Sequence, residues 1–90
     1  MVERDELLRL MKHFGRRFEG LMTVRRSGRI VGWFVWFRQP AKSVRVLRSG
    51  RRWQTQLRPT PAEALELALE IDAILARGEQ VPIPLRIKGW

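Results

Sequence analysis

The sequence contains no cysteine and only one histidine, His13. A chain without cysteine can form neither a disulfide framework nor a thiolate metal site, and this composition is typical of proteins in a reducing compartment. The longest apolar run, Ile30 to Phe37, has eight residues, far fewer than the ~20 that a membrane-spanning helix requires. The N-terminus is charged where a secretory signal needs an apolar stretch. We therefore expect a cytoplasmic protein that does not enter membranes.

Acidic residues are missing from the middle of the chain. From Gly20 through Ala62, 43 residues pass without one Asp or Glu, and they include ten basic ones: Arg25, Arg26, Arg29, Arg38, Lys42, Arg45, Arg48, Arg51, Arg52 and Arg58. Because the flanks nearly balance, the net charge of +9 arises from this segment. The same segment holds five aromatic residues: Trp33, Phe34, Trp36, Phe37 and Trp53. Guanidinium groups neutralise phosphates and flat rings stack on bases, so this combination predicts a nucleic-acid surface.

Arginine outnumbers lysine 15 to 3. This preference fits bidentate phosphate binding, and it fits a GC-rich or thermophilic genome equally well. The location of the charge is therefore the stronger evidence.

The hydrophobic pattern predicts one α+β domain over residues 1–90. A first helix is expected at about 3–18, with either Gly15 or Gly20 at its end. A second helix at about 61–77 begins at a capping box, Thr60 to Glu63, with proline at its first position and Gly78 after its end. Pro82 and Pro84 make the tail, 79–90, extended. Between the helices, at about 21–58, we expect a four-stranded antiparallel meander with strands at 21–26, 30–38, 43–48 and 51–58.

Side chains of a strand alternate between the two faces of a sheet. In the last expected strand, Trp53 and Thr55 therefore oppose Arg52, Gln54, Gln56 and Arg58. The second strand is aromatic on both sides, with Phe34 and Trp36 on one and Trp33 and Phe37 on the other. We expect Phe34 and Trp36 in the core, and Trp33 and Phe37 on the basic face as a stacking platform. The alternative is that a helix, the tail or a second subunit covers both sets.

These patterns predict a non-catalytic module that binds single-stranded DNA with little sequence preference. The expected contacts are Arg25, Trp33, Phe37, Arg38, Arg45, Arg52, Gln54, Gln56 and Arg58. Catalysis is not expected, because the carboxylates lie only in the two helices and no serine of the basic segment has an evident base. No metal or cofactor is expected either. RNA remains an alternative ligand, and a homodimer remains open.

The layout resembles two families of sheet-based single-stranded DNA-binding proteins over about residues 20–77. Val24 to Ile30 ahead of a second strand, and a Thr-Pro-x-Glu helix start after the last strand, are similar to the positive cofactor four family of transcription coactivators. The archaeal ThermoDBP type, in which helices pack on a four-stranded sheet, also allows an N-terminal helix. Both resemblances imply single-stranded DNA binding on a sheet, and the archaeal type implies that a basic, aromatic cleft holds the strand.

Two further resemblances imply other partners. Strands rich in Arg and Trp before Thr60 to Ala64 are similar to the integrase arm-binding domains, which lay a sheet in the major groove of duplex DNA. Glu63 to Leu65 together with Val81 to Pro84 resembles small antitoxin domains, which implies a protein partner instead.

Overall fold

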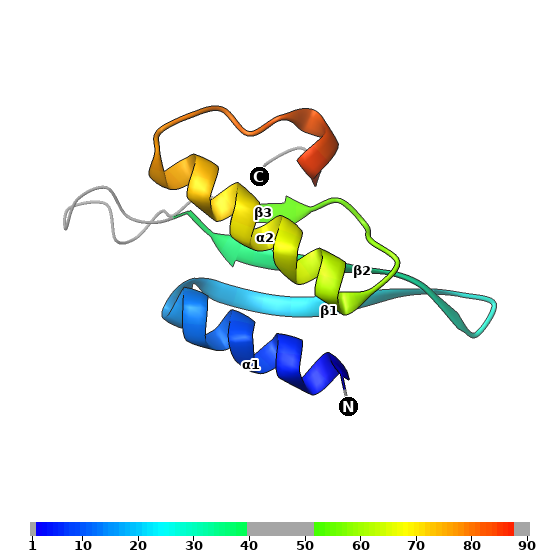
Figure 1. The fold of residues 1–90 in the computed structure, drawn as a ribbon. Helices are drawn as coiled ribbons and strands as arrows, with labels where there is room; N and C mark the ends of the chain where they lie inside the picture. Colours follow the sequence, from blue (N-terminus) through cyan, green and yellow to red (C-terminus); the bar gives the residue numbers. More distant parts are fainter. Residues whose placement is uncertain (1, 40–51, 88–90) are drawn as a thin grey trace.

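Two helices pack on one face of a small antiparallel sheet in the computed structural model, which describes residues 2–39 and 52–87 (Figure 1). The elements follow in the order α1 (Val2–Phe14), η1 (Gly15–Arg17), β1 (Phe18–Arg26), β2 (Arg29–Arg38), β3 (Arg52–Thr55), α2 (Pro61–Ala76), η3 (Ile83–Leu85) and β4 (Arg86–Ile87). The strands lie in the order β1-β2-β3-β4, and each neighbouring pair is antiparallel. The predicted α+β class is therefore confirmed.

The predicted four-stranded meander between the helices is wrong. Three strands, β1, β2 and β3, form the body of the sheet, and β2 pairs directly with β3 through Trp36 opposite Gln54. β3 thus occupies the place beside β2 that the meander gave to a strand at 43–48, a range that lies outside the described residues. The far side of β3 is paired with the two residues of β4, which come from the tail beyond α2. A meander needs only local turns, whereas β4 returns to the sheet from across a helix.

The first helix ends at its earlier candidate. α1 stops at Phe14, and Gly15 has a φ of +56°, a left-handed conformation that a residue without a Cβ adopts at little cost. Leu10 and Phe14 are buried apolar positions of α1, whereas Met11, next to Leu10 in the sequence, is 51% exposed. The buried stripe therefore follows a spacing of four residues.

The second helix has the predicted ends. The Glu63 amide donates to the Thr60 hydroxyl oxygen at 3.2 Å, and that hydroxyl donates to the Glu63 carboxylate at 3.0 Å. At the other end Gly78, with a φ of +75°, donates to the Leu75 carbonyl, and the next amide donates to the Ile74 carbonyl. These two bonds form a Schellman motif, which satisfies carbonyl groups that the helix leaves open.

β1 and β2 form a long hairpin that ends in the predicted turn. Ser27 and Gly28 both have positive φ, at 53° and 79°, as a two-residue type I′ turn requires. Two register shifts interrupt the ladder, one between Phe18 and Gly20 and the other between Val24 and Arg25. Such bulges bend a strand and change the direction of its side chains.

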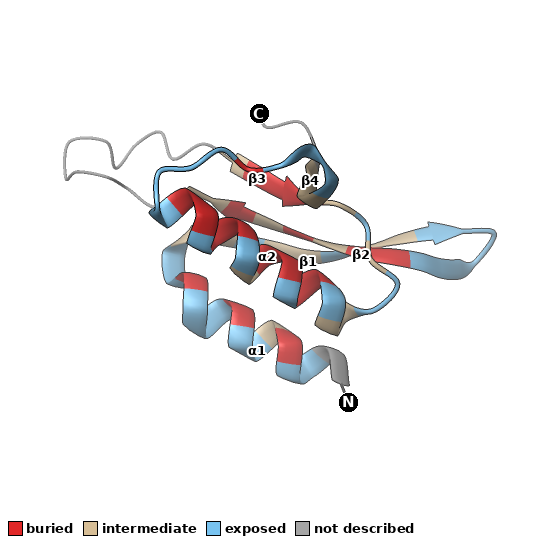
Figure 2. Cartoon of the chain, turned by 45° about the horizontal axis from the view of Figure 1, so that its top comes forward, coloured by how far each residue is buried: buried red, intermediate tan, exposed pale blue. Residues whose placement is uncertain are grey.

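The core lies between the helices and one face of the sheet. From β2 it receives Trp33, Val35 and Phe37, and from β3 it receives Trp53 and Thr55. Phe14 of α1 stacks on Phe37 with ring centroids 4.5 Å apart. Figure 2 shows buried positions along both α1 and α2, which lie together on one side of the sheet. The opposite face of the sheet is not covered by any described element.

Candidate nucleic-acid interface

The uncovered side of β1, β2 and β3 is called the open face below. Residues that pair across antiparallel strands share a face, and Met22 pairs with Phe34 while Trp36 pairs with Gln54. Phe34 and Trp36 are partly exposed, and Met22 is 40% exposed. The open face therefore presents an apolar centre with an aromatic pair.

This arrangement reverses the aromatic assignment expected from the sequence. Trp33 and Phe37 are 8% and 0% exposed and lie in the core, so the expectation that they form the platform is wrong. Phe34 and Trp36 occupy the open face in their place, with ring centroids 5.5 Å apart and planes inclined by 59°. Phe37 pairs with Trp53, and both rings enter the core because α1 and α2 cover that side.

Trp36 is held in position from two sides. Its indole N–H donates to Gln54 Oε1 at 2.6 Å, and the Arg52 guanidinium lies 5.4 Å from the ring centroid. Gln54 is itself buried and paired in the sheet. A ring fixed in this way loses little conformational freedom when a planar ligand stacks on it. The side-chain oxygen of Gln54 thus orients the Trp36 ring.

Arg38 and Arg52 share one acidic partner at the end of the open face. Glu19 accepts from Arg38 Nε at 2.6 Å, and its other oxygen lies 3.7 Å from Arg52 Nη2. Glu19 immediately precedes the acid-free segment and lies at the register shift between Phe18 and Gly20. Exposed pairs of this kind contribute only about 0–1 kcal/mol, so a phosphate can compete with Glu19 for these two arginines.

Gln56, the other glutamine expected at the site, binds the C-terminal tail. Gln56 Nε2 donates to the Arg86 carbonyl at 2.8 Å, and the Gln56 amide donates to the Leu85 carbonyl at 3.1 Å. Its side chain therefore faces the tail of this chain, and the tail follows the outer edge of β3.

Arg58 lies on the helical side of the sheet, contrary to expectation. The register of β3 would place Trp33 opposite Leu57, but Trp33 instead exchanges two backbone hydrogen bonds with Arg58. One extra residue after β3 thus reverses the alternation. Arg58 lines a small pocket with the acidic stripe of α2, Glu63, Glu66 and Glu70. Leu57 takes its place near the open face, 3.2 Å from the position that a Cβ on Gly32 would occupy.

The other two expected arginines lie away from this centre. Arg25 is exposed near the turn of the β1–β2 hairpin and pairs with Ile30. Arg45 lies outside the described residues. Of the nine expected site residues, the structure places Arg38, Arg52 and Gln54 on or beneath the open face.

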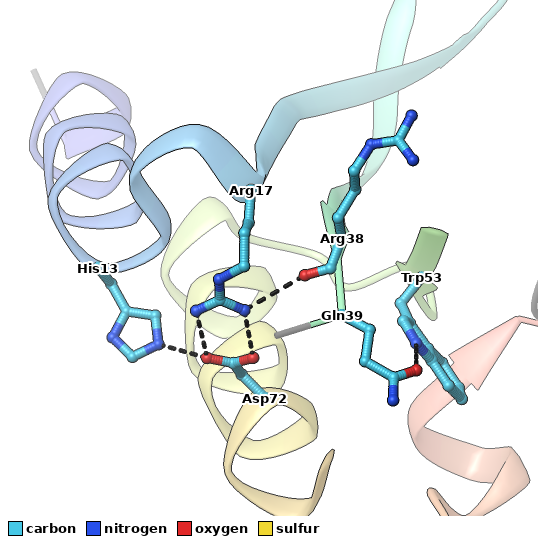
Figure 3. Close-up of polar contacts among 6 residues, drawn as sticks. All are labelled: His13, Arg17, Arg38, Gln39, Trp53 and Asp72. Carbon is cyan, nitrogen blue, oxygen red and sulfur yellow. Dashed lines mark hydrogen bonds and ion pairs between the residues drawn. The ribbon is translucent and has the colours of Figure 1, made fainter. Parts of the chain in front are cut away.

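A partly buried ionic cluster on the helical side was not predicted from the sequence (Figure 3). Asp72 of α2 accepts two hydrogen bonds from Arg17, at 2.8 and 3.1 Å, and lies 2.8 Å from His13 Nε2. Burial raises the pKa of Asp72, but hydrogen bonds from Arg17 and His13 and their charges outweigh it, so the pKa lies below its ordinary value. Arg17 also donates to the Arg38 carbonyl at 3.2 Å. The cluster therefore joins α1, η1 and α2 to the end of β2.

One signal in the sequence could have revealed this cluster. Asp72 lies between Ile71 and Ile74 on the apolar face of α2, and an acid in such a position is rarely buried without a cationic partner. The position predicts a partner but not its identity, because Arg17 and His13 belong to an element 55 or more residues away.

No family model, curated protein or solved structure matches the chain. Within the described part of the chain, neither helix has the length and apolar character needed to cross a bilayer. Over the same residues, no three histidine or carboxylate side chains gather closely enough to hold a metal ion.

Proposed function

We propose that this chain is a non-catalytic module that binds single-stranded DNA across the open face, with little sequence preference. The observation that carries the proposal is the Phe34–Trp36 pair, which lies on an uncovered sheet face within a segment rich in arginine and free of acid. Base stacking on aromatic rings tolerates any sequence, because every base has a flat π-face.

The basic residues supply the second part of the mechanism. The Arg52 guanidinium lies against the Trp36 ring, and Arg38 of β2 is the cross-strand partner of Arg52. A strand whose bases stack on Phe34 and Trp36 brings its phosphates within reach of these guanidinium groups. Each phosphate that is neutralised releases counterions, which favours binding at low salt.

The direct test is fluorescence anisotropy with labelled oligothymidine of about 15 nucleotides, a length within the range of single-stranded sites. Phe34→Ala and Trp36→Ala should each weaken binding by about 5- to 150-fold, since one stacked base contributes ~1–3 kcal/mol. Trp36→Phe should retain most of the affinity. Leu8→Ala, which truncates an exposed side chain on α1, is the matched control and should change nothing. Unchanged affinity in a folded Phe34→Ala/Trp36→Ala variant would refute stacking.

A protein partner is the second candidate, because the open face also exposes aliphatic side chains. Met22 and Leu57 are 40% and 42% exposed, and contiguous apolar surface is typical of interfaces. Sedimentation of the protein alone separates the two functions. A monomer that gains mass only with oligothymidine supports DNA binding, whereas a dimer that oligothymidine does not dissociate supports a face covered by protein. Oligouridine as a competitor then decides between DNA and RNA.

A further inference from the structure

The distal end of the β1–β2 hairpin extends past the core as a separate structure. This segment, residues 25–31, is called the arm below, and every one of its residues is exposed, whereas the adjoining Gly32 and Trp33 are buried. At ~3.3 Å per residue, the three steps from Gly28 to Val31 span about 10 Å. Figures 1 and 2 both show the hairpin reaching beyond the ends of the two helices.

The arm carries positive charge that nothing nearby balances. Arg25, Arg26 and Arg29 are three of its seven residues, and none forms an ion pair with a described residue. Arg26 and Arg29 are direct cross-strand partners. Like charges in that position destabilise a hairpin, so the sequence maintains an unfavourable pair at the tip. A polyanion bound there would remove the repulsion.

The shape of the arm selects among polyanions. A two-stranded β-ribbon fits the major groove of duplex DNA, which is about 12 Å wide and 8.5 Å deep, and a projection of about 10 Å is long enough to reach the groove floor. The type I′ turn fixes the tip without a flexible loop. The exposed Ile30 and Val31, at 43% and 49%, add apolar surface that can contact thymine methyl groups. A single strand has no groove to hold such a ribbon.

We propose that the arm grips duplex DNA next to the single strand, so that the preferred ligand is a junction between the two. Arg26 and Arg29 lie on the same side of the β1–β2 ladder as Met22 and Phe34. The unpaired residue at the register shift is Val31 of β2, so the alternation along β1 continues from Met22 to Arg26, and Arg29 pairs with Arg26. A nucleic acid that crosses the open face therefore continues onto the arm. The junction preference rests on the proposed single-strand function, whereas duplex contact by the arm does not. Two linked contacts raise the affinity for a ligand that offers both.

The experiment compares three labelled probes by anisotropy: oligothymidine, a blunt duplex, and a duplex with an oligothymidine overhang. The unaltered protein should bind the overhang probe at least about tenfold more tightly than either of the others. Arg25→Gln/Arg26→Gln/Arg29→Gln should remove that advantage and lower the log–log salt slope for the overhang probe by about 2 to 3. It should leave oligothymidine binding within a few-fold.

The matched control removes the same charge from the exposed surface of α1 and η1, in Arg4→Gln/Arg9→Gln/Arg16→Gln. This variant should keep the junction preference. If the two triple variants lose affinity for the overhang probe equally, only net charge matters for binding, and the arm proposal is wrong. An unaltered protein that binds the overhang probe no better than oligothymidine also contradicts it. Binding of the arm to anionic lipid vesicles, with no junction preference, would assign it to a membrane instead.

Failure of the proposed function has a different signature. If Phe34→Ala/Trp36→Ala leaves oligothymidine binding unchanged while the arm variant loses duplex binding, the arm proposal stands and the stacking mechanism falls. If the aromatic variant loses oligothymidine binding and the arm variant binds all three probes as the unaltered protein does, the stacking mechanism stands and the arm proposal is wrong.

Discussion

Single residues of β2 decide which side of the sheet can bind a ligand. Alternation shows that Phe34 and Trp36 share one side and that Trp33 and Phe37 share the other, but each set has one Trp and one Phe, so composition cannot rank them. The deciding contact is between strands, where Phe37 pairs with Trp53. Trp53 was correctly expected opposite Arg52, and its register with β2 would have identified the core set. That register is a long-range property which the sequence does not reveal.

Asp72 allows a prediction about acid stability. Its pKa is lowered in the folded protein, so its contribution to folding is complete above the unfolded value of about 3.9 and is lost as the pH falls through the lower folded value. Asp72→Asn leaves Arg17 without its charged partner and should reduce the free energy of unfolding by about 1–3 kcal/mol at neutral pH. Urea unfolding monitored by circular dichroism measures this difference.

The pH dependence of that difference is the sharper readout. The difference in free energy of unfolding between the unaltered protein and Asp72→Asn should be largest above pH ~4. It should become smaller as the pH falls below that value. Glu70→Gln, which neutralises an exposed carboxylate on the same helix, should show almost no gap at any pH. A constant gap from neutral to acid pH would mean that the ionic cluster is not the source of the stability.

At the scale of elements, the predicted ends of α2 and the predicted hairpin turn are confirmed, whereas the predicted four-stranded pairing is wrong. The ends of α2 and the Ser27-Gly28 turn depend on residues within a few positions of each other, and the structure confirms both. The return of β4 to the edge of β3 depends on a pairing across a whole helix. The extra residue before Arg58 likewise depends on another strand, because it arises where Trp33 of β2 pairs with Arg58 instead of Leu57. Periodicity within one segment cannot detect either feature.

The C-terminal cap of α2 yields a prediction at this scale. Gly78 has a φ of +75°, and no heavy atom lies within 4 Å of the position that a Cβ would take. Gly78→Ala should therefore cost stability through the backbone alone, by about 1 kcal/mol. Gly78→Asn, which tolerates the left-handed conformation better, should cost less. Thermal unfolding tests the order, and an alanine variant as stable as the parent would show that the cap contributes nothing.

The whole molecule separates its tasks between the two sides of one sheet. Both helices, the buried rings and the Asp72 cluster occupy one side, while the aromatic pair and the arm belong to the other. The described chain is elongated, 44 × 26 × 19 Å, because the hairpin extends past the helices. Under the proposed function, the ligand contacts only the open face, and the helical layer contributes stability. The open face can then keep exposed rings and like charges that a core would not tolerate.

This separation predicts how affinity for oligothymidine depends on salt. Engagement of four or five phosphates should give a log–log slope of about −2.8 to −3.5, since each neutralised phosphate of a single strand contributes about −0.7. Arg38→Gln/Arg52→Gln should make the slope shallower by about 1.4, because the Arg52 guanidinium lies against Trp36 and Arg38 is the cross-strand partner of Arg52 on the open face. Substitution of exposed α1 arginines should leave it nearly unchanged, since that helix lies on the other side. Anisotropy titrations between low and physiological salt supply the slopes. If the affinity does not depend on salt, phosphate is not bound at the open face. The same conclusion follows if substitutions on the open face and on the helical side change the salt slope equally.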